Sequence, residues 1–283
     1  MNDRRKRQPV PVRVLALLTA LCLLAGLCGC RKDTGGEDQG TGPSAKDEVI
    51  VLPPDEPMMG IGRITSADAK ERDQLILIDP GHGFDDPGNG DGDGSFWRDL
   101  GVRERDVTIV VAKMLDEELR KKGFRTMLTH NGEYFPEEFN YDGNNKFHPD
   151  ERVVYMNYVS PDYIVSVHVN SAGNANACGT IVFYNSTSSS KWNDWSEPAA
   201  EYIAEAIDAC VEINASTKIE NELTFDGASF AVTRDTHAAA SLIEMGYVTN
   251  YDDAQDMLNE VWQRSMAEGI ALGIARFFDS LET

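Results

Sequence analysis

Residues 75–83 read Leu-Ile-Leu-Ile-Asp-Pro-Gly-His-Gly, an apolar run followed by an acid and then a histidine. Four successive aliphatic residues, 75–78, are typical of a short strand buried on both faces. Two later segments have the same form, because an apolar run leads to His168 in one and to Glu244 in the other. The sequence therefore predicts several buried strands that end in ionisable side chains.

Amphipathic segments lie between these apolar runs, with apolar residues at helical spacing. Strands are expected over 75–78, 124–129, 163–169 and 180–184, with a further short apolar run over 241–244. Helices are expected over 106–122, 149–158 and 197–213, and over 253–281 as one long or broken helix. This alternation favours a single α/β domain in which a mixed, mostly parallel sheet is sandwiched between helices. Ligands of such sheets bind outside the strand ends.

Charge is distributed unevenly along the 283 residues, which carry 47 acids, 26 bases and a net charge of −21. Residues 1–29 contain five bases and one acid, so taking away their net +4 leaves −25 on the other 254 residues. An acidic body offers no basic patch for phosphates, which excludes a nucleic-acid partner. The basic end needs a separate explanation.

The N-terminal segment combines the cluster Arg4-Arg5-Lys6-Arg7 with 14 apolar residues over 14–27. That run suits a signal peptide over 1–29 better than a single-pass membrane anchor, which is the alternative. Leu27-Cys28-Gly29-Cys30 resembles the lipobox of bacterial lipoproteins, which implies that Cys30 carries the lipid. Two palmitate-type chains give stable anchoring, so we expect an exported protein that is lipid-anchored to the bacterial cell membrane. Residues 30–73, rich in Gly, Asp, Ser and Pro, read as a flexible linker.

Four ionisable residues carry the chemistry: His82, Glu104, His168 and Glu244. Each alone has a simpler structural explanation, such as a hydrogen-bonded strand-end histidine or an acid at a helix N-terminus. Together they include two histidines and one carboxylate, which is a ligand set of hydrolytic zinc sites, and a further carboxylate to take a proton from water. The sequence has neither His-Glu-x-x-His nor Gly-x-Ser-x-Gly, so a helical metalloprotease and a serine hydrolase lack support.

Five motifs resemble, in order and interval, those of zinc-dependent N-acetylmuramoyl-L-alanine amidases. They are Asp79-Pro-Gly-His82-Gly, Val102-Arg-Glu104-Arg-Asp-Val, Arg152 followed by Met156-Asn157, Ser166-Val-His168-Val-Asn170-Ser, and Leu242-Ile-Glu244-Met-Gly-Tyr-Val-Thr-Asn250. The resemblance covers about residues 74–281 and implies a catalytic domain over 74–283. The chain departs from the family in two places: Ala239 stands where the family often has proline, and the segment 84–99 is longer than usual.

The resemblance implies Zn²⁺ as cofactor, with His82, Glu104 and His168 as its ligands and Glu244 as the catalytic carboxylate. It also implies that the enzyme is a hydrolase, an amidase that cleaves the bond between N-acetylmuramic acid and L-alanine in peptidoglycan, the cell-wall substrate. A zinc-activated water would attack the amide carbonyl, and Glu244 would take its proton. The sequence does not show whether a protein activator is needed.

Several alternatives stay open on the sequence alone. The protein could be a zinc peptidase for other peptides, or a cell-wall-binding lipoprotein that kept the fold without the activity. Among single residues, Arg152 and Arg234 could meet a substrate carboxylate or a structural acid. The remaining choices are whether His237 reaches the site, whether Trp192 and Trp195 stack on sugar or pack under a loop, and whether Cys178 and Cys210 form a disulfide.

Overall fold

The computed structural model describes residues 71–89, 100–141, 143–144, 146–186, 193–212, 215–225 and 230–282. The expected signal peptide, Cys30 and most of the linker lie outside these ranges, as do residues 90–99. Among the helices in the described ranges, none has the length and apolar character needed to cross a membrane.

A six-stranded sheet with the order β2-β1-β3-β6-β4-β5 is the centre of the fold. Its first four strands in that order are mutually parallel, β4 runs antiparallel to β6, and β5 runs parallel to β4. The predicted mixed, mostly parallel α/β sheet is therefore confirmed. The strand bounds are β1 Leu75–Pro80, β2 Arg125–Leu128, β3 Tyr163–Asn170, β4 Ile181–Tyr184, β5 Lys218–Asn221 and β6 Ala239–Tyr247.

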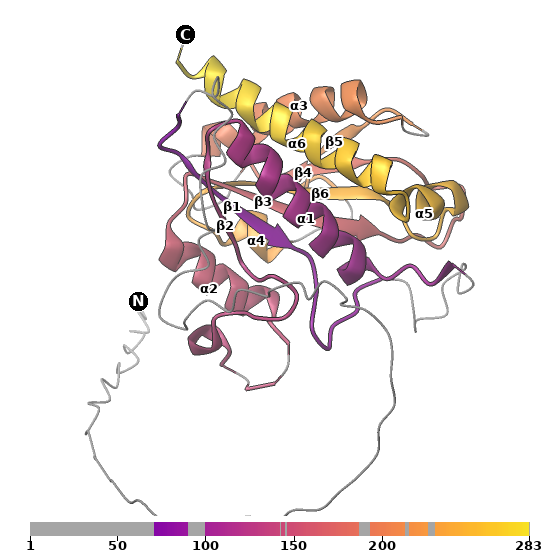
Figure 1. The fold of residues 1–283 in the computed structure, drawn as a ribbon, viewed down its shortest axis with the longest axis horizontal. Helices are drawn as coiled ribbons and strands as arrows, with labels where there is room; N and C mark the ends of the chain where they lie inside the picture. The colour runs from indigo at the N-terminus through magenta and orange to yellow at the C-terminus, as the bar shows by residue number, and fades with distance from the viewer. Residues whose placement is uncertain are drawn as a thin grey trace, which may run out of the picture. The chain divides into compact units, whose positions relative to one another are not determined.

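Helices cover both faces of this sheet (Figure 1). One layer contains α1 (Glu104–Lys121), α3 (Asn193–Cys210) and α6 (Glu260–Ser280), and α6 contacts both α1 and α3. The other face carries α2 (Pro149–Val159) and the short α4 (Ala231–Arg234). Two short elements precede longer helices: α5 (Tyr251–Met257) leads into α6, and the 3-10 turn η2 (Glu137–Phe139) precedes α2.

Side-chain alternation along β3 decides which residues face each layer. Val165, Val167 and Val169 join the core beneath α1, α3 and α6, whereas Ile164 packs in the smaller core with residues of α2. His168 therefore points to the face opposite α1, α3 and α6.

The sequence pattern missed β5 and placed some boundaries wrongly. β5 is an edge strand with its first two residues exposed, so it carries no buried run to detect. Of the long or broken helix expected over 253–281, the structure has the broken form, because the side chain of Asn259 accepts the backbone N–H of Val261 and begins α6 anew. β6 also starts earlier than the 241–244 run, at Ala239, which pairs with Tyr163 of β3.

Candidate metal centre

The site forms where parallel strands end at the same edge of the sheet. His82 follows the last residue of β1 by two positions, and His168 of β3 lies directly opposite Glu244 of β6 in the strand register. Glu104, which the sequence placed just before a helix, is the first residue of α1. The fold therefore brings together the four ionisable residues that the sequence singled out.

Glu104 lies between the two histidine rings. Its Oε2 is 3.2 Å from Nε2 of His82, and its Oε1 is 2.9 Å from Nδ1 of His168. The two rings meet edge to face, with centroids 5.2 Å apart. One ligand atom from each of the three residues lies within 4.8 Å of the other two. Two imidazoles and one carboxylate converging in this way suit a tetrahedral cation with an open fourth position.

Backbone amides hold the Glu104 carboxylate in place. Val169 donates its N–H to Oε1 at 2.9 Å, and Asn89 donates its N–H to Oε2 at 2.7 Å. The Asn89 side-chain amide in turn donates to the carbonyl of Val169 at 2.8 Å, which ties the segment before residue 90 to the end of β3. Burial alone would raise the pKa of Glu104, but hydrogen bonds and charge from His168 and His82 hold it well below its ordinary value. The carboxyl is therefore ionised, as a metal ligand must be.

Two glycines let the backbone approach these side chains closely. A Cβ atom on Gly81 would stand 2.5 Å from the His168 ring, and one on Gly88 would stand 2.6 Å from Oε2 of Glu104. Gly88 also has a positive φ of 66°, which a residue with a side chain rarely adopts. The two glycines therefore form a cradle around His82, Glu104 and His168, and alanine in place of either glycine would clash with these side chains.

Glu244 stands beside the three-residue group and differs from it electrostatically. Burial and the negative charge of Glu104 raise the pKa of Glu244 to about 8, against a smaller lowering by His82. Its Oε2 is buried and has no hydrogen-bond partner among the described residues. A carboxyl group with a pKa near neutrality and an oxygen left available is suited to accept and return a proton.

A buried polar network supports the turn that carries His82. Asp79 is fully buried and accepts hydrogen bonds from Arg152 at 3.0 Å, Ser166 at 2.7 Å and Thr129 at 2.7 Å. Arg152 also donates to the carbonyl of Pro80 at 2.8 Å. This arrangement decides one open alternative, because Arg152 meets a structural acid and is only 3% exposed.

His130 is a site-supporting residue that the sequence analysis missed. It follows β2, and its Nε2 lies 2.8 Å from the carbonyl of Pro80, to which it donates. Its ring also contacts Phe84, just beyond His82. Burial and the Arg152 charge lower the pKa of His130 to about 4, against an opposing effect of Asp79, so the ring is neutral at physiological pH. Its sequence signal, a lone histidine after a short apolar run, is too weak to identify it.

The other open residues lie away from the cluster or outside the described ranges. His237 is exposed ahead of β6, at the end of the strand remote from Glu244. Arg234 is exposed and pairs with Asp235, and Trp195 packs against Phe277 and Phe278. Cys178 and Cys210 are free cysteines, and Trp192 is not among the described residues.

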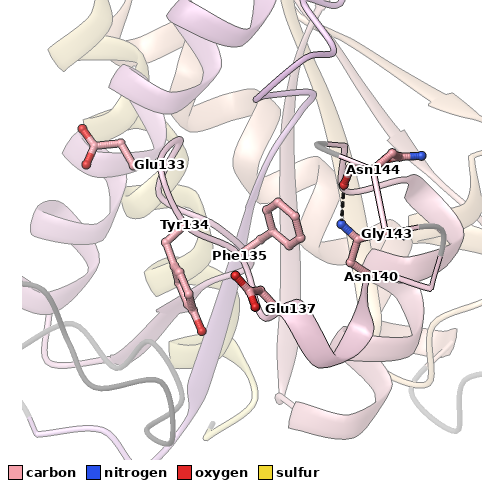
Figure 2. A pocket seen from close by; sticks show the side chains of 7 residues that line it. All are labelled: Glu133, Tyr134, Phe135, Glu137, Asn140, Gly143 and Asn144. Carbon is pink, nitrogen blue, oxygen red and sulfur yellow. Dashed lines mark hydrogen bonds between the residues drawn. The ribbon is translucent and has the colours of Figure 1, made fainter. Parts of the chain in front are cut away.

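A hollow of about 450 Å³ lies beside the turn that follows β2 (Figure 2). Its lining comprises Glu133, Tyr134, Phe135, Glu137, Asn140, Gly143 and Asn144, none of which belongs to the group of His82, Glu104 and His168. Phe135 contacts Phe84 at a centroid distance of 4.6 Å, which links the wall of the hollow to the turn after His82. The hollow is thus a neighbour of the site and not the site itself.

Comparisons with known proteins identify similar sequences and similar folds. The uncharacterised protein YqiI of Bacillus subtilis is 26% identical over 206 residues, which are 73% of this chain and 85% of YqiI. The N-acetylmuramoyl-L-alanine amidase LytC of the same organism is 24% identical over 253 residues; the match covers 87% of this chain but only 45% of LytC. The crystal structure of an N-acetylmuramoyl-L-alanine amidase from Clostridium difficile 630 matches with a TM-score of 0.59 and 26% identity, covering 73% of this chain and 97% of that one.

The family profile described as N-acetylmuramoyl-L-alanine amidase, Amidase_3, matches residues 76–276. That span runs from β1 into α6 and contains His82, Glu104, His168 and Glu244. Because the match covers well over half of the chain, the protein belongs to the Amidase_3 family of N-acetylmuramoyl-L-alanine amidases.

Proposed function

We propose that this protein is a zinc-dependent amidase of the cell envelope, which hydrolyses the bond between N-acetylmuramic acid and L-alanine in peptidoglycan. The observation that carries the proposal is the convergence of His82, Glu104 and His168 on one point, with Glu244 beside them. Membership of the amidase family supports the class of bond.

His82, Glu104 and His168 would hold the Zn²⁺ ion. The fit rests on the donor set, on the ionised state of Glu104, and on the glycine cradle around the three side chains. When bound, the ion would supply a Lewis acid for the amide carbonyl and lower the pKa of water towards neutrality.

Glu244 would move the proton during hydrolysis. Its carboxylate accepts a proton from the attacking water and returns it to the nitrogen of the departing L-alanine, so that the products are a free lactyl carboxylate and a free amine. The raised pKa of Glu244 suits both halves of this transfer, since a group that titrates near neutrality can take and give a proton at similar cost.

Export and anchoring complete the proposal. Residues 1–29 would direct export, lipidated Cys30 would hold the protein at the bacterial membrane, and residues 30–73 would tether a catalytic domain over 74–283. Peptidoglycan lies on that side of the membrane, so the location and the proposed substrate agree.

The deciding experiment is digestion of purified peptidoglycan by residues 31–283, with and without a chelator, followed by mass analysis of the products. We expect stem peptides with free N-terminal alanine, which disappear with chelator and return when Zn²⁺ is restored. Cleavage within the stem peptide would instead identify a zinc peptidase. Stoichiometric zinc with no cleavage of any wall substrate would identify a binding protein.

A single substitution tests the role of Glu244. Glu244→Gln removes the proton acceptor and should lower turnover by about 10²–10⁴-fold while zinc content stays at one per chain. Glu205→Gln makes the same chemical change on the exposed surface of α3 and should leave turnover unaltered. Loss of zinc from Glu244→Gln would show that Glu244 is a ligand.

A further inference from the structure

The His82 ring has a second partner besides Glu104. Its Nδ1 lies 2.9 Å from Oδ2 of Asp86, while its Nε2 faces Oε2 of Glu104 at 3.2 Å. The two ring nitrogens thus have distinct environments, one directed at the ligand cluster and the other at a carboxylate outside it.

Asp86 is fixed by the turn in which it lies. Gly83 and Asp86 exchange two backbone hydrogen bonds, each 2.9 Å long, which close the turn directly behind His82. The other carboxylate oxygen of Asp86, Oδ1, accepts the backbone N–H of Gly88 at 3.2 Å. With one oxygen held by Gly88, the carboxylate is positioned to present the other to His82.

The backbone around His82 is held independently of this contact. Gly81 donates its N–H to Val167 at 2.8 Å and accepts the hydroxyl of Thr108 at 2.7 Å. His82 itself has a φ of 60°, in the left-handed region. These contacts fix the main chain, whereas the rotation of the ring about its side-chain bonds is set by the contacts of the ring itself, with Glu104 at Nε2 and with Asp86 at Nδ1.

We propose that Asp86 is a positioning residue that keeps the His82 proton on Nδ1 and thereby turns the Nε2 lone pair towards the metal site. An ionised carboxylate only accepts hydrogen bonds, so Nδ1 keeps its hydrogen opposite Asp86 when a metal ion takes the place of the hydrogen on Nε2, the nitrogen that faces Glu104. A neutral imidazole with hydrogen on Nδ1 has its lone pair on Nε2, which is one of the two arrangements that metal-binding histidines adopt. This inference rests on the proposed metal-dependent function and names a residue of that site which the sequence analysis did not identify.

The chain offers a matched control, because Asp85 precedes Asp86 and is exposed. Asp86→Asn and Asp85→Asn remove the same charge at adjacent positions of one turn. In Asp86→Asn, the single amide oxygen can accept from Gly88 or from His82, but not from both with the geometry of the carboxylate. Asp85→Asn leaves both of these hydrogen bonds intact.

The test measures zinc affinity of the full chain in detergent by competition with a chromophoric chelator. Asp86→Asn should bind zinc about 10- to 100-fold more weakly than the unaltered protein, which is the usual effect of losing such a partner. Asp85→Asn should bind within about twofold of the unaltered protein, since no ligand contact changes. Thermal unfolding in excess chelator should show similar midpoint temperatures for all three proteins, because the substitutions change the orientation of one ring and not the fold.

A spectroscopic measurement separates positioning from a general structural role. In the zinc-loaded unaltered protein, ¹⁵N-labelled histidine spectra should show that Nδ1 of His82 carries hydrogen. The ¹⁵N chemical shift of Nε2 should be perturbed by the bound metal. In Asp86→Asn this signature should weaken or show a mixture of tautomers, and Asp86→Glu should restore part of the affinity.

The outcomes distinguish this inference from the function on which it rests. If the unaltered protein binds zinc but Asp86→Asn binds it equally tightly with the same tautomer, the positioning role is wrong and the proposed function stands. If the unaltered protein binds no zinc, both are wrong. If Asp85→Asn loses as much affinity as Asp86→Asn, general charge and not the specific contact is responsible, and the positioning role is again wrong.

Discussion

At the residue scale, the contact that most constrains the turn before His82 is the ion pair between Asp79 and Arg152. Both side chains are buried, with side-chain exposures of 0% and 4%, and Arg152 also donates to Pro80. Burial raises the pKa of Asp79, but Arg152, Ser166 and Thr129 together hold it below its ordinary value. We expect Arg152→Met to lower the free energy of unfolding by about 3–5 kcal/mol, because it strands a buried charge. Urea denaturation in chelator measures the change.

The control for this pair removes both charges. The double variant Asp79→Asn, Arg152→Met leaves no uncompensated ion and should recover part of the loss seen with Arg152→Met alone. Equal destabilisation in the single and double variants would show that the lost hydrogen bond to Pro80, and not the stranded charge, accounts for the effect.

His130 provides a pH-dependent prediction at the same scale. Its pKa is about 4 in the folded protein and 6.5 when unperturbed, so between these values the unfolded state binds more protons than the folded state. Its contribution to stability is therefore complete above about pH 6.5 and falls as the pH drops towards 4. We expect the unfolding free energy of the metal-free protein, relative to that of His130→Gln, to fall by about 2 kcal/mol from pH 7 to pH 5. Denaturation curves of the two proteins that shift in parallel with pH would contradict this.

Single residues of the site differ in whether the sequence could predict them. His82, His168 and Glu244 were detectable because each follows or ends an apolar run, and parallel strands bring such ends together. Asp86 and Asn89 were not detectable, because their contacts depend on the turn between residues 83 and 89 and on positive φ angles at His82 and Phe84. No periodic pattern encodes a turn of that kind.

At the element scale, two glycines set the distance between α6 and α3. A Cβ atom on Gly273 would stand 2.4 Å from the Cα atom of Ile203, and one on Gly269 would stand 3.0 Å from the Cα atom of Ile207. Alanine is better than glycine in a free helix by about 1 kcal/mol, so an isolated α6 would gain from Gly273→Ala. We expect the opposite in the protein, a net loss of about 1–2 kcal/mol in unfolding free energy, because the backbone of α3 must move. Chemical denaturation measures it.

The control for this packing is an exposed position of the same helix. Glu268→Ala changes an exposed position of the same helix and should alter the unfolding free energy by less than about 0.5 kcal/mol. If Gly273→Ala stabilised the protein as helix propensity alone predicts, the close contact between α3 and α6 would not be a constraint on the fold.

Elements also differ in how far the sequence predicts them, and burial explains the difference. β1 and β3 lie inside the sheet with almost every residue buried, so their apolar runs were visible. β5 lies at the edge and carries Lys218 and Glu220, so nothing in its pattern separates it from a loop. The antiparallel direction of β4 was equally hidden, since strand direction depends on the path of the connection and not on the composition of the strand.

At the scale of the whole molecule, the net charge opposes the proposed location at a membrane. Residues 30–283 carry a net charge of −25, and anionic membrane surfaces attract basic segments and repel acidic ones. The protein therefore needs an attachment other than charge if it works at a membrane, and two acyl chains at about 0.8 kcal/mol per buried CH₂ would outweigh the repulsion. We expect residues 31–283, without lipid, to stay free of vesicles that contain anionic lipid in a sedimentation assay.

The attachment itself can be assigned to one atom by metabolic labelling with an alkyne analogue of palmitate. Cys30→Ser should abolish the label, because the lipobox reading places the lipid on that sulfur, while Cys28→Ser should keep it. Cys28 is the matched control, since it is the same residue type two positions away in the same segment.

Retention of the label in Cys30→Ser and its loss in Cys28→Ser would move the anchor to Cys28. Only retention in the double variant Cys28→Ser, Cys30→Ser would leave Cys22, the other cysteine of the expected signal peptide, as the acceptor in that segment, and the chain would then keep its basic end. Because Arg4, Arg5, Lys6 and Arg7 would remain attached, such a protein should sediment with the anionic vesicles that lipid-free residues 31–283 avoid.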